Sequence, residues 1–408
     1  MILTSRERVR LAMDHKEADM IPIDFGGMRS TGISAIAYNK LKDYLSMHKY
    51  PTKMYDIFQQ LAEPDLDILN FMHGDVVQVH RYEPAFGINI NKWKQSILQD
   101  GSHCLVPFDY NPIKNSKGGF DIINNNQTIA RMPKGGLYFD VITHPYENVQ
   151  TLDDIDKIPL PKLSDTEIFF LINEAKNLYE NTSYSILGSF GGNVVEDGQL
   201  DWGYEKFFMQ LALEPDLMHY YFNRKVENHL KNLKKYMAAV GKYVDIVQFG
   251  DDLGTQENSQ ISINMYKEMI KPYHKKQYSF VRNNYPNVKV FLHSCGSIYD
   301  LIPELIDAGV QILNPVQISA RRMNPLTLKN EFGKELTFWG AGASTQTTVS
   351  FGTINEIKKE VEELIKIFAP GGGFIFSQIH NIQADISPEK IIAIYDTANR
   401  FRKYPILY

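Results

Sequence analysis

After Leu160 the chain repeats one pattern, in which a short apolar segment, a loop and an amphipathic segment follow one another. The apolar segments are continuous rather than alternating, which is typical of parallel strands buried on both faces. Strands that alternate with helices predict a parallel sheet whose outer face is covered by the helices. The apolar segments are "YSILGSFGG", "YVDIVQFGDD", "VKVFLHSCG", "VQILNPVQIS", "LTFWGAGAS" and "GGFIFSQIHN".

Two earlier apolar segments, "IPIDF" and "DVVQV", bring the count to about eight, the number that closes a (β/α)8 barrel. A doubly wound sheet is the alternative, because strand order is not written in the sequence. We favour a single-domain barrel over residues 1–408, since polar residues recur at the carboxyl ends of strands, where barrel active sites are built. Periodicity also predicts helices in "ISAIAYNKLKDYLSM" and "MYDIFQQLAEPDLDILNFM".

The pattern changes between Glu83 and Tyr146, where short alternating segments are separated by turns rich in glycine and asparagine. Examples are "HCLVPFDY", "GGFDIINNNQTIARM" and "GGLYFDVITH". Alternation over a few residues, bounded by such turns, predicts antiparallel hairpins inserted into the barrel. The sequence leaves open whether this insert covers the barrel mouth or lies at the far end.

Charge and composition exclude several classes of partner. The net charge of −5 argues against a surface for nucleic acid or for an anionic membrane. No apolar stretch is long enough to span a bilayer, and the first residues do not have the pattern of a signal peptide. Cys104 and Cys295 are too few for a disulfide framework, so we expect a reducing cytoplasm. The oligomeric state is not fixed, although a homodimer would be unsurprising.

His293 and Cys295 stand two positions apart just past the apolar run of "VKVFLHSCG". Residues two apart in an extended chain point to the same side, so both can face the barrel mouth. Imidazole and thiolate are ligands that zinc prefers, and a catalytic zinc takes three protein ligands and keeps one open position. The alternative is a small buried cysteine beside a hydrogen-bonded histidine.

The last predicted strand repeats this design, because Gln378 and His380 stand two apart just past "FIF". His380 is the candidate for the third metal ligand, and a His, Cys, His set from two strands is a plausible zinc site. The alternative is an ordinary loop histidine.

Asp251 and Asp252 end the strand "DIVQFG" and are the candidate catalytic carboxylates. A carboxylate there can orient a ligand histidine, complete the metal shell or accept a proton from substrate. We favour Asp252, because it shares a strand face with Gln248 and Gly250. The alternative is a solvated pair that caps the next turn.

Four further residues are candidates for substrate binding together with Gln378. Arg29 in "GGMRSTG" and His80 after "DVVQV" can hold an anionic group, or can simply be surface residues. Asn314 and Gln317 in "LNPVQIS" offer neutral hydrogen bonds at the mouth.

The His-X-Cys-Gly loop, "VQFGDDLGTQ" and "SQIHNIQADISPEKI" together resemble the uroporphyrinogen decarboxylase superfamily over most of the chain. That superfamily has a (β/α)8 barrel and includes zinc-dependent cobamide methyltransferases. Those enzymes carry a His-X-Cys zinc pair, which His293 and Cys295 match, and a further cysteine after the last strand, where His380 stands here. The decarboxylases hold a substrate with eight carboxylates through an arginine-rich segment near the start, where this chain offers only Arg29.

The resemblance to the methyltransferase branch implies a zinc-dependent transfer of a methyl group between a corrinoid and a small molecule, such as a thiol or a folate. The methyl-corrinoid would come on a separate corrinoid protein, since the chain shows no recognisable Asp-X-His-X-X-Gly motif for cobalamin. Two alternatives stay open: a metal-independent decarboxylase of a small carboxylated substrate that uses Asp252, and a non-catalytic partner of a corrinoid protein.

Overall fold

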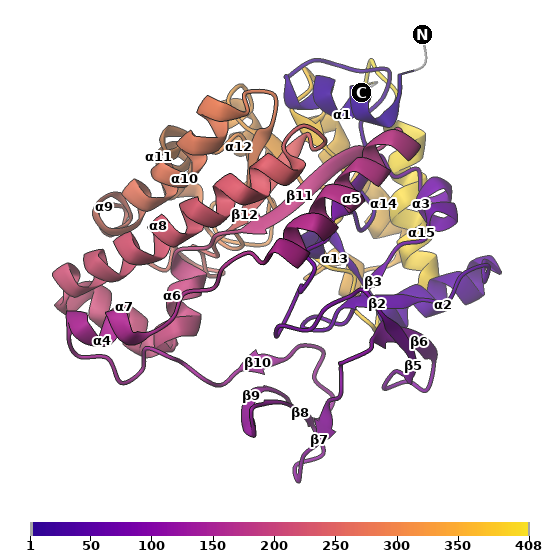
Figure 1. The fold of residues 1–408 in the computed structure, drawn as a ribbon. Coiled ribbons are helices and arrows are strands. Elements are labelled where there is room, and N and C mark those ends of the chain that lie inside the picture. The colour runs from indigo at the N-terminus through magenta and orange to yellow at the C-terminus, as the bar shows by residue number, and fades with distance from the viewer. Residues whose placement is uncertain (1–2, 407–408) are drawn as a thin grey trace.

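A seven-stranded parallel sheet forms the centre of the computed structural model, which describes residues 3–406 (Figure 1). Its order is β16-β15-β14-β13-β12-β11-β4, so strands that follow one another in the sequence are neighbours. The strands are β4 (Val76–Val79), β11 (Ser185–Gly191), β12 (Ile246–Gly250), β13 (Lys289–His293), β14 (Ile312–Asn314), β15 (Thr337–Trp339) and β16 (Phe374–Ile375). Each lies in an apolar segment that the sequence predicts as a strand.

Both edges of this curled sheet contact the segment "IPIDF", residues 21–25. Ile23 forms a parallel bridge with Phe376, directly after β16. On the other side, the backbone N–H of Asp75, directly before β4, donates to the carbonyl of Ile23. The predicted eighth strand is therefore present only as a bridge. The prediction of eight strands has to be corrected to a curled parallel sheet of seven, because the segment is too short and too irregular to form a ladder.

One apolar residue from each strand points into the curl and packs into a single interior cluster. These residues are Val76, Leu187, Ile246, Phe291, Ile312, Trp339 and Ile375. Helix α1 (Ser5–Met13), which begins with a Thr4–Glu7 capping box, adds Val9, Ala12 and Met13 to the same cluster. Because strand residues alternate in direction, residues two positions further along each strand also face inward. The interior is thus apolar near α1 and polar toward the carboxyl ends of the strands.

Helices lie on the outer face of the sheet, as predicted (Figure 1). None of those in the described chain combines the length and the apolar composition needed to cross a membrane. The helices are α2 (Ala35–Leu45), α3 (Leu66–Phe71), α4 (Leu152–Lys157), α5 (Asp165–Asn181), α6 (Val195–Trp202), α7 (Tyr204–Leu213), α8 (Pro215–Val240), α9 (Ile263–Met265), α10 (Lys271–Asn284), α11 (Ile302–Ala308), α12 (Pro325–Phe332), α13 (Thr348–Phe351), α14 (Ile354–Phe368) and α15 (Pro388–Phe401).

The segment "MYDIFQQLAE" forms a hairpin, where the sequence predicts a helix. Strands β2 (Lys53–Asp56) and β3 (Leu61–Glu63) pair with Lys53 opposite Glu63. Gln60 lies at φ +55°, a turn conformation that interrupts any helix at this point. The apolar residues of this stretch fit a helical period and a strand equally well, so periodicity alone chose the wrong element. The helix expected at its end is present as α3.

The region predicted as an insert, Glu83 to Tyr146, contains antiparallel strands in two sheets. One is a five-stranded sheet, in which β5 and β6 extend β1 (Ile33–Ser34), β3 and β2. The other is a four-stranded sheet at the end of the molecule away from the two termini (Figure 1). The strands are β5 (Trp93–Ile97), β6 (His103–Pro107), β7 (Ile113–Lys114), β8 (Phe120–Asn124), β9 (Gln127–Met132) and β10 (Asp140–Val141).

Candidate metal centre

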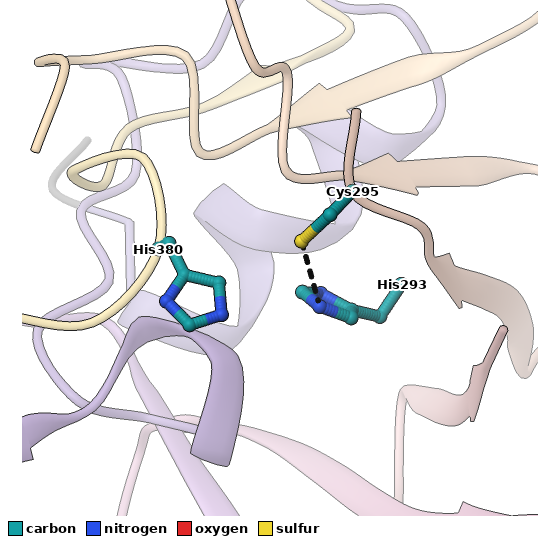
Figure 2. A group of neighbouring side chains, drawn as sticks. All are labelled: His293, Cys295 and His380. Carbon is teal, nitrogen blue, oxygen red and sulfur yellow. Dashed lines mark hydrogen bonds between the residues drawn. The ribbon is translucent and has the colours of Figure 1, made fainter. Parts of the chain in front are cut away.

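The three predicted metal ligands lie together at the carboxyl end of the parallel sheet (Figure 2). His293 is the last residue of β13, and the Sγ atom of Cys295 lies 3.4 Å from its Nε2. His380 follows β16, and the centre of its ring is 5.8 Å from that of His293. One donor atom from each residue can be chosen so that all three lie within 4.8 Å of one another. Spacing by two residues therefore places both members of the His-X-Cys pair on the inner side.

The donor set fits a zinc ion. Zinc bonds of about 2.0 Å to nitrogen and about 2.3 Å to sulfur hold tetrahedral ligand atoms about 3.5 Å apart. The separation of Cys295 and His293 matches this spacing, and His380 lies within reach of the same ion. Three protein ligands leave one tetrahedral position for a further molecule, which is the pattern of catalytic rather than structural zinc.

Asn314 fixes which ring nitrogen of His293 is free to bind a metal. The Asn314 Nδ2 lies 3.1 Å from the carbonyl of Trp339, which can only accept a hydrogen bond, so the amide N–H groups must face that way. The Oδ1 then faces Nδ1 of His293 at 2.8 Å and accepts its proton. Nε2, on the side of Cys295, keeps its lone pair. A partner on the second ring nitrogen is characteristic of metal-binding histidines.

Burial shifts the pKa values of the other two candidate ligands, His380 and Cys295. Removal from water, and then the neighbouring His293, lower the pKa of His380 to about 4, so its imidazole is neutral at pH 7 and can donate a lone pair. Burial, and then the charge of Asp252, raise the pKa of the Cys295 thiol well above its usual value. Without a cation this thiol keeps its proton, whereas a bound zinc ion supplies the positive charge that favours the thiolate.

The two predicted catalytic carboxylates have different surroundings. Asp251 is fully buried, and its two oxygens accept the backbone N–H groups of Val194, Val195 and Glu196 and contact His274 Nε2 at 2.7 Å. Its carboxylate holds the start of α6. Asp252 faces the metal ligands instead.

The Asp252 Oδ1 atom accepts the backbone N–H of Cys295 at 2.8 Å and lies 3.7 Å from Nε2 of His293. Its side chain is 35% exposed, so a small molecule can reach it. Of the two carboxylates, Asp252 is therefore the one that a small molecule at the candidate metal site can reach.

The five residues predicted to bind substrate all have partners within the protein. Arg29 pairs with the buried carboxylate of Asp56, and His80 lies 3.3 Å from Glu63. Asn314 holds His293. Three further hydrogen bonds hold the remaining two residues. Gln317 accepts the backbone N–H of Gly296, and Gln378, which is fully buried, donates to the carbonyl of Thr31 and accepts from the hydroxyl of Tyr395. These contacts orient the loops around the metal ligands.

His380 has an unusual backbone conformation, with φ +67°. Left-handed φ values are uncommon for residues other than glycine, although asparagine, aspartate and histidine adopt them more readily. The next residue fixes the loop: Asn381 accepts the backbone N–H of Gly32 through Oδ1 and donates to Gln59 through Nδ2. The His380 loop is thus tied to the amino-terminal part of the chain.

Glu196 belongs to the same site but was not predicted. A methyl group added to Gly250 would come within 3.5 Å of its Oε2, and Gly250 is the register partner of His293. Residues 246, 248 and 250 of β12 point to the same side, which is the inner side of the curled sheet. The Glu196 carboxylate therefore lies on the inner side, at the carboxyl end of β12. Burial, followed by the charges of Asp252 and Asp251, raises the pKa of Glu196 well above its ordinary value. The only sequence signal was an acidic residue in a loop after a predicted strand.

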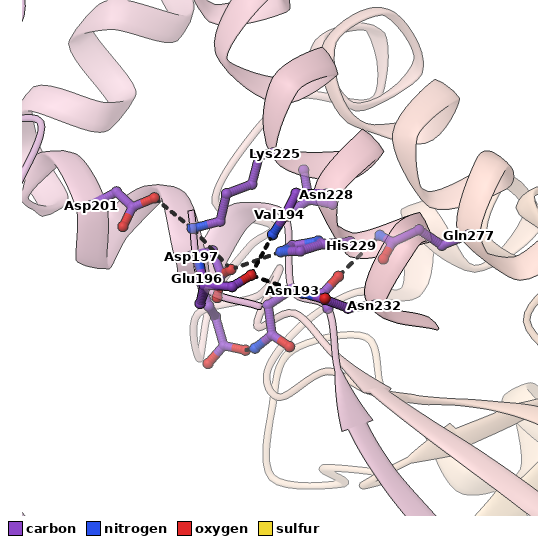
Figure 3. Close-up of polar contacts among 12 residues, drawn as sticks. Asn193, Val194, Glu196, Asp197, Asp201, Lys225, Asn228, His229, Asn232 and Gln277 are labelled. Atoms are coloured by element: carbon purple, nitrogen blue, oxygen red, sulfur yellow. Dashed lines mark hydrogen bonds and ion pairs between the residues drawn. The ribbon is translucent and has the colours of Figure 1, made fainter. Parts of the chain in front are cut away.

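A network of ion pairs fixes the orientation of Glu196 (Figure 3). The next residue, Asp197, pairs with Lys225 at 3.2 Å and with His229 at 3.3 Å, both on α8. One turn later, Asp201 lies 2.6 Å from Lys225. Consecutive residues of a helix point in directions about 100° apart. Because Asp197 points toward α8, the side chain of Glu196 points in a different direction, toward the sheet. Asn193 Nδ2 donates to Glu196 Oε2 at 2.6 Å.

The insert region lies over the end of the sheet that carries the metal ligands. Tyr138, between β9 and β10, accepts a hydrogen bond through its hydroxyl from Gln383 at 2.7 Å, three residues past His380. Pro84 accepts from Arg29 at 3.4 Å, and the backbone N–H of Phe139 donates to Phe58. These contacts answer the question that the sequence left open, because they place residues of the insert at the mouth.

A cavity of about 450 Å³ lies at the other end of the sheet, beside α1. Its lining includes Arg8, Asp75 and Arg402, and Arg8 is held by Asp75 at 2.6 Å and by Asp19 at 2.8 Å. In barrels with this arrangement of strands, the amino-terminal end serves stability, whereas chemistry is found at the carboxyl end. We therefore take the three candidate metal ligands as the candidate functional site.

Comparisons with known proteins concern the family and the fold. Residues 144–401 match the family model described as uroporphyrinogen decarboxylase (URO-D). A methyltransferase from Methanosarcina mazei has a similar fold, with a TM-score of 0.62 at 16% identity over 98% of this chain and 99% of that chain. No curated protein matches the sequence significantly.

Two other solved structures resemble only parts of the fold. An endo-1,4-beta-xylanase from Caldicellulosiruptor owensensis gives a TM-score of 0.32 at 11% identity, over 56% of this chain and 82% of that chain. A 7,8-dihydropteroate synthase from Vibrio fischeri gives 0.28 at 14% identity, over 47% and 60%.

Proposed function

The chain belongs to the uroporphyrinogen decarboxylase family, and we propose that it is a zinc-dependent methyltransferase of that family. It would move a methyl group between a corrinoid on a partner protein and a small acceptor or donor. The observation that carries the proposal is the meeting of His293, Cys295 and His380 at the carboxyl end of the sheet. The shared fold with the Methanosarcina mazei methyltransferase supports it.

Each residue of the site has a role in this proposal. His293, Cys295 and His380 would hold the zinc ion, with Asn314 fixing the tautomer of His293. A bound zinc ion at such a site lowers the pKa of a coordinated thiol, which makes it a nucleophile at neutral pH. Asp252, 3.7 Å from Nε2 of His293 and partly exposed, would accept the proton that the thiol loses.

The surroundings of the cations weigh against the decarboxylase alternative. A substrate with several carboxylates needs unpaired arginine or lysine side chains, ideally in bidentate geometry. Arg29 is already paired with Asp56, which is fully buried, and His80 contacts Glu63. Releasing Arg29 to a substrate would leave the Asp56 carboxylate buried without a counter-charge, at a cost of several kcal/mol.

Metal analysis and a methyl-transfer assay test the proposal. Protein purified without chelator should contain about one zinc ion per chain, and Cys295→Ser should lose it. With free methylcobalamin as donor and 2-mercaptoethanol as acceptor, the wild-type protein should form cob(I)alamin, and chelation should abolish this activity. The matched control is Cys104→Ser, since Cys104 is buried in the insert region away from the metal ligands.

Other outcomes would favour the alternatives. Absence of zinc, together with an unchanged Cys295→Ser variant, would refute the proposal. Release of carbon dioxide from a small carboxylated substrate that survives chelation would support the decarboxylase. Tight association with a corrinoid protein without any turnover would support a non-catalytic partner.

A further inference from the structure

The cavity at the amino-terminal end of the sheet has the size and the lining of a site for a small polar molecule. Its volume of about 450 Å³ falls within the range of about 300–1,000 Å³ that is typical of ligand sites. Four parts of the chain meet around it, namely α1, the segment from α3 to β4, the loop before β11 and the residue after α15. All lining residues except Leu66 and Gly74 carry a polar or charged side chain, so an apolar ligand would find few partners here.

Arg402, directly after α15, lines this cavity without a firm partner. Its side chain is only 13% exposed, and its Nη1 lies 3.8 Å from Oδ2 of Asp75. That oxygen already accepts the backbone N–H of Ile23 at 2.9 Å, and Oδ1 of Asp75 accepts from Arg8. Within residues 3–406 the guanidinium of Arg402 makes no hydrogen bond. A guanidinium has five N–H donors, and largely buried donors without acceptors cost free energy, so Arg402 offers unused donors to an oxyanion.

Arg8, which lines the same cavity, has its partners within the protein. It pairs with Asp75 at 2.6 Å and with Asp19 at 2.8 Å, and it donates to the carbonyl of Leu3. Burial lowers the pKa of Arg8, but the hydrogen bond to Asp19 and the charge of Asp75 outweigh it, so the pKa is raised. Burial also lowers the pKa of Arg402, and there the charge of Asp75 does not offset it. The cavity thus has one arginine with full compensation and one without.

Further hydrogen-bond donors line the cavity beside Arg402. In the described part of the chain, neither the ring of His73 nor the hydroxyl of Ser5 has a hydrogen-bond partner. Oδ1 of Asn70 accepts from the hydroxyl of Tyr184, so the Nδ2 group of Asn70 is left to donate. Ser5 is also the first residue of α1, and the amino-terminal end of a helix carries a partial positive charge. These groups favour a ligand that is negative and rich in acceptors.

The acids around the cavity are compensated within the protein. Asp75 is the one carboxylate among the lining residues, and its side chain is only 3% exposed. Arg8 and Arg402 together balance the charges of Asp75 and Asp19. Arg6 adds a further positive charge, because it donates to backbone carbonyls of the loop before β11 and has no acid within 4.0 Å among residues 3–406. A bound anion would therefore not face an uncompensated carboxylate.

We propose that this cavity binds a small phosphate ester, with the phosphate group on Arg402, His73 and the amino-terminal end of α1 and the rest of the molecule in the remaining space. A guanidinium matches a phosphate in bidentate geometry, and phosphate oxygens accept from several donors at once. The site lies at the opposite end of the sheet from the candidate metal ligands, so it does not rest on the proposed function. A ligand that connects four parts of the chain there stabilises the folded protein.

Binding of four small molecules tests the proposal. Glycerol 3-phosphate, inorganic phosphate, glycerate and glycerol separate the contributions of the phosphate group, of a negative charge and of the organic part. In calorimetric titrations at neutral pH and constant ionic strength, glycerol 3-phosphate should bind and inorganic phosphate should bind more weakly. Glycerate, which offers a carboxylate instead, should bind about tenfold or more below glycerol 3-phosphate, and glycerol should not bind. Both phosphates should raise the temperature of unfolding.

Variants of the lining residues locate the binding. Arg402→Gln should weaken binding of glycerol 3-phosphate about 10- to 100-fold, because it removes charged hydrogen bonds to the phosphate. Arg402→Lys keeps the charge but not the fork of donors, so its affinity should be intermediate. Ser5→Ala removes one hydroxyl and should weaken binding by a smaller factor, which gives a second measurement if Arg402→Gln is unstable. Arg400→Gln is the matched control, because Arg400 is exposed, lies outside the cavity and should not affect binding.

Three results would overturn the inference. They are no binding of either phosphate at millimolar concentration, equal affinity of the wild type and Arg402→Gln for glycerol 3-phosphate, and binding of glycerate as tight as that of glycerol 3-phosphate. Zinc content and methyl transfer from methylcobalamin are measured separately and should be the same in Arg402→Gln as in the wild type. Failure of this inference therefore leaves the proposed function standing, and failure of the proposed function leaves this inference standing.

Discussion

Asn314 and His293 face each other across neighbouring strands, with the amide Oδ1 of Asn314 2.8 Å from Nδ1 of the histidine. The two residues are register partners in β14 and β13. Because the amide nitrogen of Asn314 is held by the carbonyl of Trp339, the orientation of the amide, and hence the tautomer of His293, follows from the fold. The fold itself thus leaves the lone pair on Nε2, the ring nitrogen on the side of Cys295.

Replacing Asn314 should weaken metal binding without removing a ligand. Asn314→Leu takes away the acceptor for Nδ1 of His293, so the ring can turn and can adopt the other tautomer. We expect zinc affinity to fall about 10- to 100-fold, the usual effect of losing such a partner. Competition with a chromophoric chelator measures it. Asn314→Asp, which keeps an acceptor for Nδ1, should recover much of the affinity, and an unchanged Asn314→Leu variant would contradict the assignment.

The reactivity of Cys295 should respond to Asp252. In the metal-free protein the raised pKa of the Cys295 thiol, caused by burial and then by Asp252, keeps it protonated at pH 7, so alkylation by iodoacetamide should be slow. Asp252→Asn removes a negative charge that opposes the thiolate, so alkylation should become faster, by about tenfold for each unit by which the pKa falls.

The alkylation should be measured by mass spectrometry in a Cys104→Ser background, so that only one thiol reacts. Zinc should protect Cys295 in both proteins. A rate that Asp252→Asn leaves unchanged would show that the carboxylate does not influence the thiol.

Adjacent Asp251 and Asp252 should differ in what their loss affects. Asp251→Ala leaves three backbone N–H groups at the start of α6, and His274, without their shared acceptor. We expect a loss of about 3–5 kcal/mol in the free energy of unfolding. Asp252→Asn, on a partly exposed side chain, should cost about 1 kcal/mol or less but should impair methyl transfer. Urea unfolding separates the two, and a stable, inactive Asp251→Ala variant would reverse the assignment.

Replacing His380 with glycine should leave the stability of the fold unchanged but should remove zinc binding. Its φ of +67° is strained for a residue with a Cβ atom and free for glycine. His380→Gly should therefore unfold at about the same temperature as the wild type while zinc affinity is largely lost, whereas His380→Cys should keep zinc by offering a thiolate. Thermal unfolding and zinc content, measured on both variants, check this. A His380→Gly variant that keeps its zinc would remove His380 from the ligand set.

The strands and the convergence of the His293 and Cys295 side chains could be predicted because both depend on short-range rules. Continuous apolar runs mark buried parallel strands, and the two-residue spacing of His293 and Cys295 puts both on one side whatever the rest of the chain does. The same rule chose Asp252 over Asp251, since consecutive strand residues face opposite ways. The same pattern at the last strand predicted that His380 lies near this pair, and its ring centre is 5.8 Å from that of His293.

The partners of the site could not be predicted, because they depend on how distant elements pack. Arg29 pairs with Asp56, the last residue of β2, which lies in a hairpin whose apolar residues fit a helical period as well. Glu196 reaches the site only because Asp251 holds the start of α6 and Lys225 holds its outer side. Neither contact produces a pattern within a short stretch of sequence, so the positions of these charged groups around the candidate metal ligands could be learned only from the fold.

Asp24 should make stability depend on pH in the mildly acidic range. It is fully buried, and it accepts from Gly27 N, Thr31 Oγ1 and Trp339 Nε1. Burial raises its pKa from 3.8 to about 6, against the effect of these donors. Between those two values the folded protein binds a proton that the unfolded chain releases. The stability that this proton contributes is fully present below about pH 4 and is lost as pH rises to about 6.

Asp24→Asn isolates this contribution, because asparagine does not titrate. The free energy of unfolding of the wild type, minus that of the variant, should fall by about 2 kcal/mol between pH 4 and pH 6, because one pKa unit corresponds to 1.36 kcal/mol and the slope is smaller near each of the two pKa values. It should then stay constant up to pH 8. Urea unfolding of both proteins at a series of pH values measures the difference. A flat difference would mean that the three donors keep the carboxylate ionised in the folded protein despite its burial, and that Asp24 holds the Gly27–Thr31 loop as an anion throughout this range.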